Sequence, residues 1–142
     1  MKGDLLIVNY HKHEGNREKT TPFEVGAHLA TIKRVSLKKT KAGLEKLVLL
    51  LEGENGETGF YNLTFNDFVA ENLNLILTSI DDNGEPIPEM SFGYDGATAQ
   101  FLTGKEVYIK VGMETYQGER RSVIKTFLNQ EEFDYATNFE DG

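Results

Sequence analysis

The chain has 142 residues, of which 39% are hydrophobic and 27% are charged, a composition typical of one soluble globular domain. It contains no cysteine, which excludes disulfides, thiolate metal sites and cysteine nucleophiles and fits a reducing compartment. No stretch approaches the roughly 18 apolar residues of a membrane helix. The apolar run Leu5–Val8 is too short for the hydrophobic region of a signal peptide. We therefore expect a cytoplasmic protein.

The formal net charge of −8 at first sight disfavours nucleic acid as a partner. The charge is unevenly distributed, however. Residues 66–95 hold seven acidic and no basic residues, and residues 130–142 hold five acidic and no basic residues. Residues 22–65 and 96–129 together hold 11 basic and 8 acidic residues. A basic surface can therefore form locally on a protein that is acidic overall.

The chain divides into an N-terminal extension (1–21), one domain (22–129) and an acidic tail (130–142). Leu5–Val8 in the extension could add an edge strand. The first strand of the domain is predicted over residues 25–37, where the apolar alternation changes phase at Lys33-Arg34, as a β-bulge would produce.

A second strand is predicted over Leu44–Glu52 and a third over Thr58–Phe65, joined by a hairpin turn at Asn55-Gly56. The apolar spacing then becomes helical. The residues that form this apolar stripe are Phe68, Val69, Leu73, Ile76, Leu77 and Ile80. Thr64 or Asn66 is the expected N-cap.

The helix should end at Asn83-Gly84, and an irregular acidic loop is expected from Asp81 to Gly96. Two further strands are predicted over Lys105–Tyr116 and Arg120–Leu128. The result is a mainly β fold: a five-stranded OB-type barrel with one helix between strands three and four. A β-sandwich would need more strands and no helix.

Two segments carry a resemblance to a known family: residues 22–52 (PFEVGAHLATIKRVSLKKTKAGLEKLVLLLE) and 102–127 (LTGKEVYIKVGMETYQGERRSVIKTF). They resemble the small single-stranded DNA-binding proteins encoded by bacteriophages of Gram-positive bacteria. The matching positions are Gly104-Lys105, Val107, Ile109, Val111, Glu114, Tyr116, Gly118 and Ile124. The resemblance covers about residues 22–129 and implies an OB-fold that binds single-stranded DNA in phage DNA replication or recombination, in the cytoplasm of the bacterial host. The family often ends in an acidic C-terminal tail, as this chain does.

Binding of a single strand requires cations along the phosphates and aromatic rings that stack on the bases. The candidate cations are Lys33, Arg34, Lys38, Lys39, Lys41, Lys46, Lys110, Arg120, Arg121 and Lys125. The candidate aromatic residues are Phe60, Tyr61, Tyr108 and Tyr116. Each also has a structural interpretation: the lysines as a solvated turn, Tyr108 and Lys110 as a hydrated sheet face, and Tyr116 as a hairpin corner.

For two further pairs of aromatic residues, the sequence bears on whether each ring belongs to the core or can contact DNA. Phe60 and Tyr61 are adjacent and point to opposite faces of a strand, so only one of them can belong to the core. Phe92 and Tyr94 lie in the acidic loop, where we expect them to pack rather than to bind DNA.

The tail interleaves acid with the aromatic residues Phe133, Tyr135 and Phe139, and we expect it to be disordered. It could dock replication or recombination proteins, or mimic DNA and compete for the binding groove, or simply solubilise the terminus. The alternative function is accordingly an OB-fold adaptor that recruits replication proteins through this tail. A third alternative is a small hydrolase or nuclease inhibitor that mimics DNA. The chain could also pair into a homodimer.

Catalysis finds little support in the sequence. His11 and His13 lack a third metal ligand nearby, and the chain has no phosphate-binding glycine loop. The acidic pairs Asp81-Asp82 and Glu131-Glu132 do not by themselves make an acid–base site. We therefore expect no enzyme activity, no cofactor and no metal.

Overall fold

The computed structural model describes residues 21–139, so the strand predicted at Leu5–Val8 lies outside the described residues. The elements, in chain order, are β2 (Gly26–Lys39), β3 (Glu45–Gly53), β4 (Thr58–Thr64), α2 (Val69–Asp82), α3 (Gly96–Leu102), β5 (Glu106–Tyr116), β6 (Glu119–Leu128) and α4 (Gln130–Phe139).

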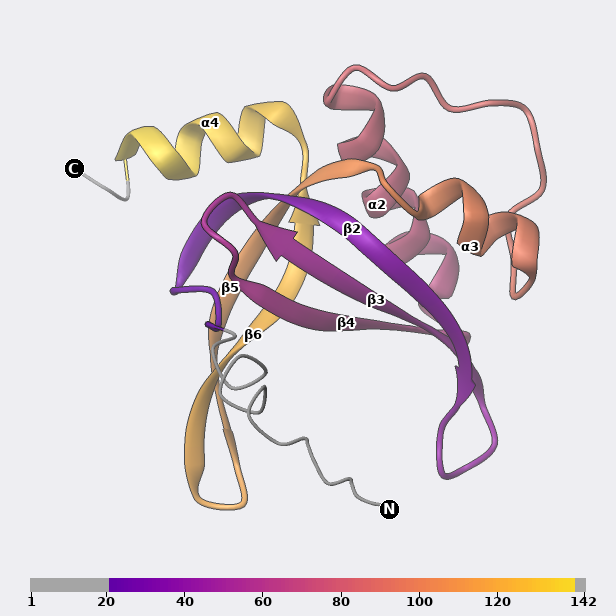
Figure 1. The fold of residues 1–142 in the computed structure, drawn as a ribbon, viewed down its shortest axis with the longest axis horizontal. Coiled ribbons are helices and arrows are strands. Elements are labelled where there is room, and N and C mark those ends of the chain that lie inside the picture. Colours follow the sequence, from indigo (N-terminus) through magenta and orange to yellow (C-terminus); the bar gives the residue numbers. More distant parts are fainter. Residues whose placement is uncertain (1–20, 140–142) are drawn as a thin grey trace, which may run out of the picture.

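The five strands form one antiparallel sheet in the order β4-β3-β2-β5-β6, and the prediction of a mainly β fold is confirmed. The sheet is strongly curved (Figure 1). The predicted bulge is present in β2, where the register with β3 shifts between Ile32 and Arg34 and leaves Lys33 as the extra residue. A second bulge lies in β6, where Lys125 is the extra residue opposite Lys110 and Val111. Bulges of this kind increase the local bend of a strand.

The concave face of the sheet carries the core, because alternate residues of each strand point to the same side. Its fully buried side chains are Ile32, Leu47, Leu49, Leu51, Leu63, Val107, Ile109 and Val111. Ile76 and Ile80 of α2 and Leu102 of α3 complete this cluster. Each such aliphatic side chain contributes roughly 1.5–3 kcal/mol by leaving water.

The predicted helix after the third strand is confirmed as α2, but it begins differently from the prediction. Phe68 occupies the N-cap position and no side chain caps the helix. The Asn66 side chain instead accepts a hydrogen bond from the Phe68 N–H at 2.9 Å. Phe68 is 62% exposed, so it does not belong to the buried stripe in which the sequence pattern placed it.

The prediction of one helix between strands three and four is wrong, because α3 follows α2 before β5 begins. The Asp95 side chain caps α3 by accepting a hydrogen bond from the Thr98 N–H at 2.8 Å. The aromatic residues of the preceding loop pack as expected. Phe92 lies edge-on to Phe101 of α3, and Tyr94 lies edge-on to Phe65.

The prediction of a disordered tail is wrong for residues 130–139, which form α4. Asn129 and Glu132 form a reciprocal capping box, with N–H to side-chain oxygen distances of 2.9 and 2.7 Å. The helix contacts β2, β5 and β6. It covers Tyr108, whose ring stacks on Phe133 with 4.2 Å between ring centroids.

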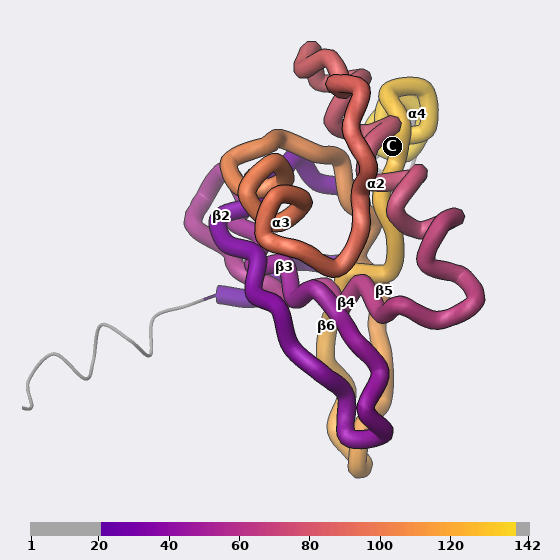
Figure 2. Tube along the Cα trace, turned by 90° about the vertical axis from the view of Figure 1, so that its right-hand side faces the viewer, coloured from indigo at the N-terminus to yellow at the C-terminus, as the bar shows by residue number. Residues whose placement is uncertain are grey.

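The two hairpin turns, between β2 and β3 and between β5 and β6, extend from one side of the molecule, while α2, α3 and α4 lie toward the other (Figures 1 and 2). None of the helices within residues 21–139 is both long enough and apolar enough to span a membrane.

Candidate nucleic-acid interface

The convex side of β2, β3 and β4 forms a continuous surface that we call the outer face. The antiparallel registers align its side chains in three cross-strand rows. These rows are Arg34–Leu50–Phe60, Ser36–Val48–Asn62 and Lys38–Lys46–Thr64. They point away from the buried Leu47, Leu49 and Leu51 because side chains alternate along β3.

Three predicted cations, Arg34, Lys38 and Lys46, lie together on the outer face. Within residues 21–139 none of them lies within ion-pair distance of a carboxylate. Lys33 differs, since its ammonium pairs with Glu52 at 3.2 Å. The outer face therefore presents uncompensated positive charge, while the charge of the neighbouring bulge lysine is neutralised locally.

The remaining predicted lysines of this region, Lys39 and Lys41, are exposed at the β2–β3 turn. The end of β2 is held by Tyr94, whose hydroxyl donates to the Lys38 carbonyl at 3.0 Å. The acidic loop thus contacts the backbone at the end of β2, while the side chains of Lys39 and Lys41 remain exposed.

The ambiguity between Phe60 and Tyr61 is resolved by the direction of their side chains. Phe60 is 59% exposed on the outer face. Tyr61 points inward, where its ring lies edge-on to Phe127 of β6 with 4.8 Å between centroids. Burial raises the pKa of the Tyr61 hydroxyl, because the charged form is disfavoured away from water. Phe60 is therefore the ring of this pair that is available for stacking.

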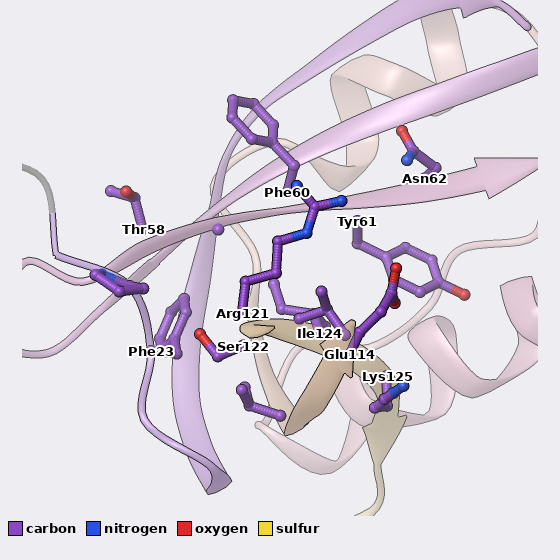
Figure 3. Close-up of a pocket in the computed structure, with 14 residues that line it drawn as sticks. Phe23, Thr58, Phe60, Tyr61, Asn62, Glu114, Arg121, Ser122, Ile124 and Lys125 are labelled. Atoms are coloured by element: carbon purple, nitrogen blue, oxygen red, sulfur yellow. The ribbon is translucent and has the colours of Figure 1, made fainter. Parts of the chain in front are cut away.

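A groove of about 530 Å³ lies between β4 and β6, which are the two end strands of the sheet (Figure 3). We call it the β4–β6 groove. Phe60 and Asn62 line it from β4, so it adjoins the outer face, and Arg121 and Lys125 line it from β6. Within residues 21–139, Glu114 is the one carboxylate that lines it.

The hairpin of β5 and β6 carries two more predicted residues, Tyr116 and Arg120. The Arg121 guanidinium lies 4.8 Å from the centre of the Tyr116 ring, a cation–π contact that holds both side chains in place. Arg120 is exposed at the start of β6.

The prediction that Tyr108 faces solvent is wrong, because α4 covers its ring. Tyr108 is only 8% exposed. Its ring is stacked on Phe133 and its hydroxyl donates to Gln130 at 2.9 Å. Lys110, two residues on, is exposed, and it lines a second depression together with Tyr135 of α4.

The predicted docking residues of the tail differ in exposure. Phe133 is half-buried against Tyr108, whereas Tyr135 is 65% exposed. The side chain of Phe139 lies outside the described residues. Within residues 21–139, no three His, Asp or Glu side chains come together as metal ligands would.

Neither a scan against models of known protein families nor a search of curated proteins finds a match for the chain.

Proposed function

We propose that the protein binds single-stranded DNA without sequence preference and without catalysis. The observation that carries the proposal is the outer face, on which an exposed aromatic ring, Phe60, lies in one sheet with the unpaired cations Arg34, Lys38 and Lys46. Such a surface can stack a base while it neutralises phosphates, and neither contact depends on base identity.

We also propose that the sheet is an OB-type barrel. The strand order, with a helix after the third strand, supports this assignment, and so does the approach of the two end strands at Tyr61 and Phe127. In OB-folds the second and third strands and the two hairpin loops bind oligonucleotides. Here those elements are β3, β4 and the two turns that extend from the same side of the molecule (Figure 2).

The net charge of −8 is compatible with this function because acidic and basic residues occupy different elements. The seven acidic residues of 66–95 belong to α2 and the segments around it, and three further acidic residues lie on α4. The unpaired cations belong to the strands. Five of them, the three of the outer face and the two of the β4–β6 groove, predict a slope of log K against log salt of about −3.5 for a single strand.

The test is fluorescence anisotropy of a labelled oligothymidylate of about 16 nucleotides, titrated with the full-length protein at low and high salt. We expect salt-sensitive binding that duplex DNA does not compete away. Phe60→Ala should weaken binding about five- to hundredfold, because one base loses its stacking partner. The matched control is Phe68→Ala, since Phe68 is equally exposed but lies at the start of α2.

The double variant Lys38→Gln/Lys46→Gln should weaken binding and flatten the salt slope by about 1.4. Lys105→Gln serves as its control, because Lys105 pairs with Glu85 at 3.4 Å beside α3. Absence of salt-sensitive binding by the wild-type protein would refute the proposal.

A role in phage DNA replication or recombination, in the cytoplasm of a bacterial host, is likewise proposed, on the sequence resemblance alone. The alternative function, an adaptor that recruits replication proteins, draws support from α4, which presents Tyr135 beside Glu131 and Glu132. An adaptor would bind its partner through α4 with no dependence on Phe60, which separates the two functions in a pull-down with Phe60→Ala and Tyr135→Ala variants. A homodimer is a further proposal, to be tested by the solution mass.

A further inference from the structure

The β4–β6 groove combines features that general affinity for a DNA backbone does not require. It has an apolar floor, one exposed aromatic ring at its rim and two cations on one wall. We infer that this groove seats a single nucleotide of the bound strand, with its phosphate between Arg121 and Lys125 and its base against Phe60. The inference rests on the proposed function and specifies one site within it.

Lys125 owes its position to the bulge in β6. As the extra residue it lies outside the alternation of the strand, and its aliphatic chain lies across the backbone of Gly112 in β5. A Cβ atom at residue 112 would come within 3.1 Å of the Lys125 Cε and 3.2 Å of its Cγ. A bulge re-aims a side chain in this way, and glycine at 112 leaves room for it. Lys125 thereby lines the groove.

Arg121 reaches the groove from the opposite end of the same wall. In Figure 3 its side chain extends from β6 towards Phe60, and Glu114 lies between Arg121 and Lys125. Although Glu114 is its cross-strand partner, Arg121 lies over Tyr116 and, within the described part of the chain, pairs with no carboxylate. Like Arg121, Lys125 has no ion pair there. Two unpaired cations against one carboxylate favour an anion as the occupant.

The remaining lining suits the rest of a nucleotide. Val111, Tyr61 and Ile124 form the apolar floor, and the volume of about 530 Å³ falls within the roughly 300–1,000 Å³ of small-ligand clefts. An added peptide strand fits less well, because the Thr58 N–H at the start of β4 already donates to the Thr21 carbonyl at 2.8 Å. That bond blocks the edge of β4 where strand addition would begin.

The test compares Arg121→Gln, Lys125→Gln and Gly112→Ala with the wild-type protein, using the labelled oligothymidylate and free thymidine 5′-monophosphate. Lys33→Gln is the matched control, since Lys33 is the extra residue of the other bulge but is engaged with Glu52. Gly96→Ala controls for the added methyl group, because a Cβ there meets no atom within 4 Å.

We expect each cation variant to weaken oligonucleotide binding about tenfold and to reduce the salt slope by about 0.7. Gly112→Ala acts through Lys125 and should produce the same changes to a smaller degree. In amide spectra the monophosphate should shift residues around Phe60, Arg121 and Lys125, whereas inorganic phosphate should shift only the surroundings of the two cations. Both controls should behave as wild type.

If the groove variants bind the oligonucleotide as wild type does while Phe60→Ala and Lys38→Gln/Lys46→Gln lose affinity, the groove inference is wrong and the proposed function stands. If the wild-type protein binds no oligonucleotide, the proposed function is refuted and the inference with it. If the amide chemical shifts that change on addition of the monophosphate belong to residues away from the β4–β6 groove, the inference that the groove binds a nucleotide is wrong.

Discussion

The rings of Tyr108 and Phe133 are stacked 4.2 Å apart with an angle of only 17° between their planes. This contact fastens the acidic C-terminal helix to the convex side of β5. It also means that Phe133 occupies the position that a base would take if Tyr108 were exposed, with Glu131, Glu132 and Asp134 beside it on the same helix.

Removal of residues 130–142 should leave the fold intact, lower the free energy of unfolding by about 1–3 kcal/mol as Tyr108 loses its cover, and raise the affinity for DNA. The affinity gain is expected because five carboxylates leave the protein. Chemical denaturation and anisotropy measure the two effects. Phe133→Ala is the companion variant, because it weakens the packing but keeps every charge. An unchanged affinity in the truncated protein would eliminate competition between tail and DNA.

Ser79→Ala should destabilise the protein by about 1–3 kcal/mol. The Ser79 hydroxyl is fully buried and accepts a hydrogen bond from the Tyr108 N–H at 2.7 Å, which ties α2 to β5. Without it a buried N–H loses its partner. Thr78→Ala, at the exposed neighbouring position of α2, should change stability by no more than about 0.5 kcal/mol. Equal effects of the two substitutions in urea denaturation would contradict this role.

Gln117→Asn should stabilise the protein by about 0.5 kcal/mol. Gln117 and Gly118 occupy the turn between β5 and β6 with φ values of 52° and 83°, a conformation in which asparagine followed by glycine is favoured. Gly118→Ala should lower stability by about 1 kcal/mol, because a side chain at that φ is strained. Thermal unfolding of the two variants measures both effects. A melting temperature that falls for Gln117→Asn would contradict the expected stabilisation.

Glu114→Gln should tighten binding of oligothymidylate about two- to fivefold, since it removes a carboxylate that lines the β4–β6 groove. The gain should shrink at high salt. Glu106→Gln, at the exposed start of the same strand, removes an equal charge away from the groove and should have little effect. Identical gains from both variants would show that only the net charge matters.

The acid stability of the protein should depend slightly on Glu57. Its carboxylate accepts a backbone hydrogen bond from Asn55 at 3.0 Å, and backbone hydrogen bonds hold its pKa below the ordinary value. The stabilisation is therefore present above the ordinary pKa and is lost as the pH falls through the lowered one. Glu57→Gln should be slightly less stable than wild type near neutral pH and equal to it in strong acid. A carboxyl titration by NMR that shows no depression at Glu57 would contradict this.

The strands could be predicted because their alternation is local. Val107, Ile109 and Val111 repeat every second residue, and the phase change at Lys33-Arg34 marks the first bulge. The bulge at Lys125 left the same kind of signal, since the apolar pattern passes from Ile124 to Phe127 in three steps instead of two.

What could not be predicted depends on contacts between distant residues. The burial of Tyr108 requires Phe133, and nothing in the alternation of β5 reveals a helix 22 or more residues later. The helix itself left a signal in Asn129 and Glu132, which have the spacing of a capping box. The acidic residues of the tail indicated disorder. Packing of α4 against β5 stabilises the helix in spite of that local preference.

Each of the two bulges contains one position at which the side chain can vary without changing the register of the strands. Lys33 and Lys125 are surplus to the pairing of their strands, so the identity of their side chains does not determine which residues point into the core. Changes at either position can therefore alter the charge on the convex surface while the interior keeps its register. Substitution at Lys125 can therefore change the affinity for a ligand without endangering the fold, whereas Lys33 is paired with Glu52 and its substitution should leave that affinity unchanged.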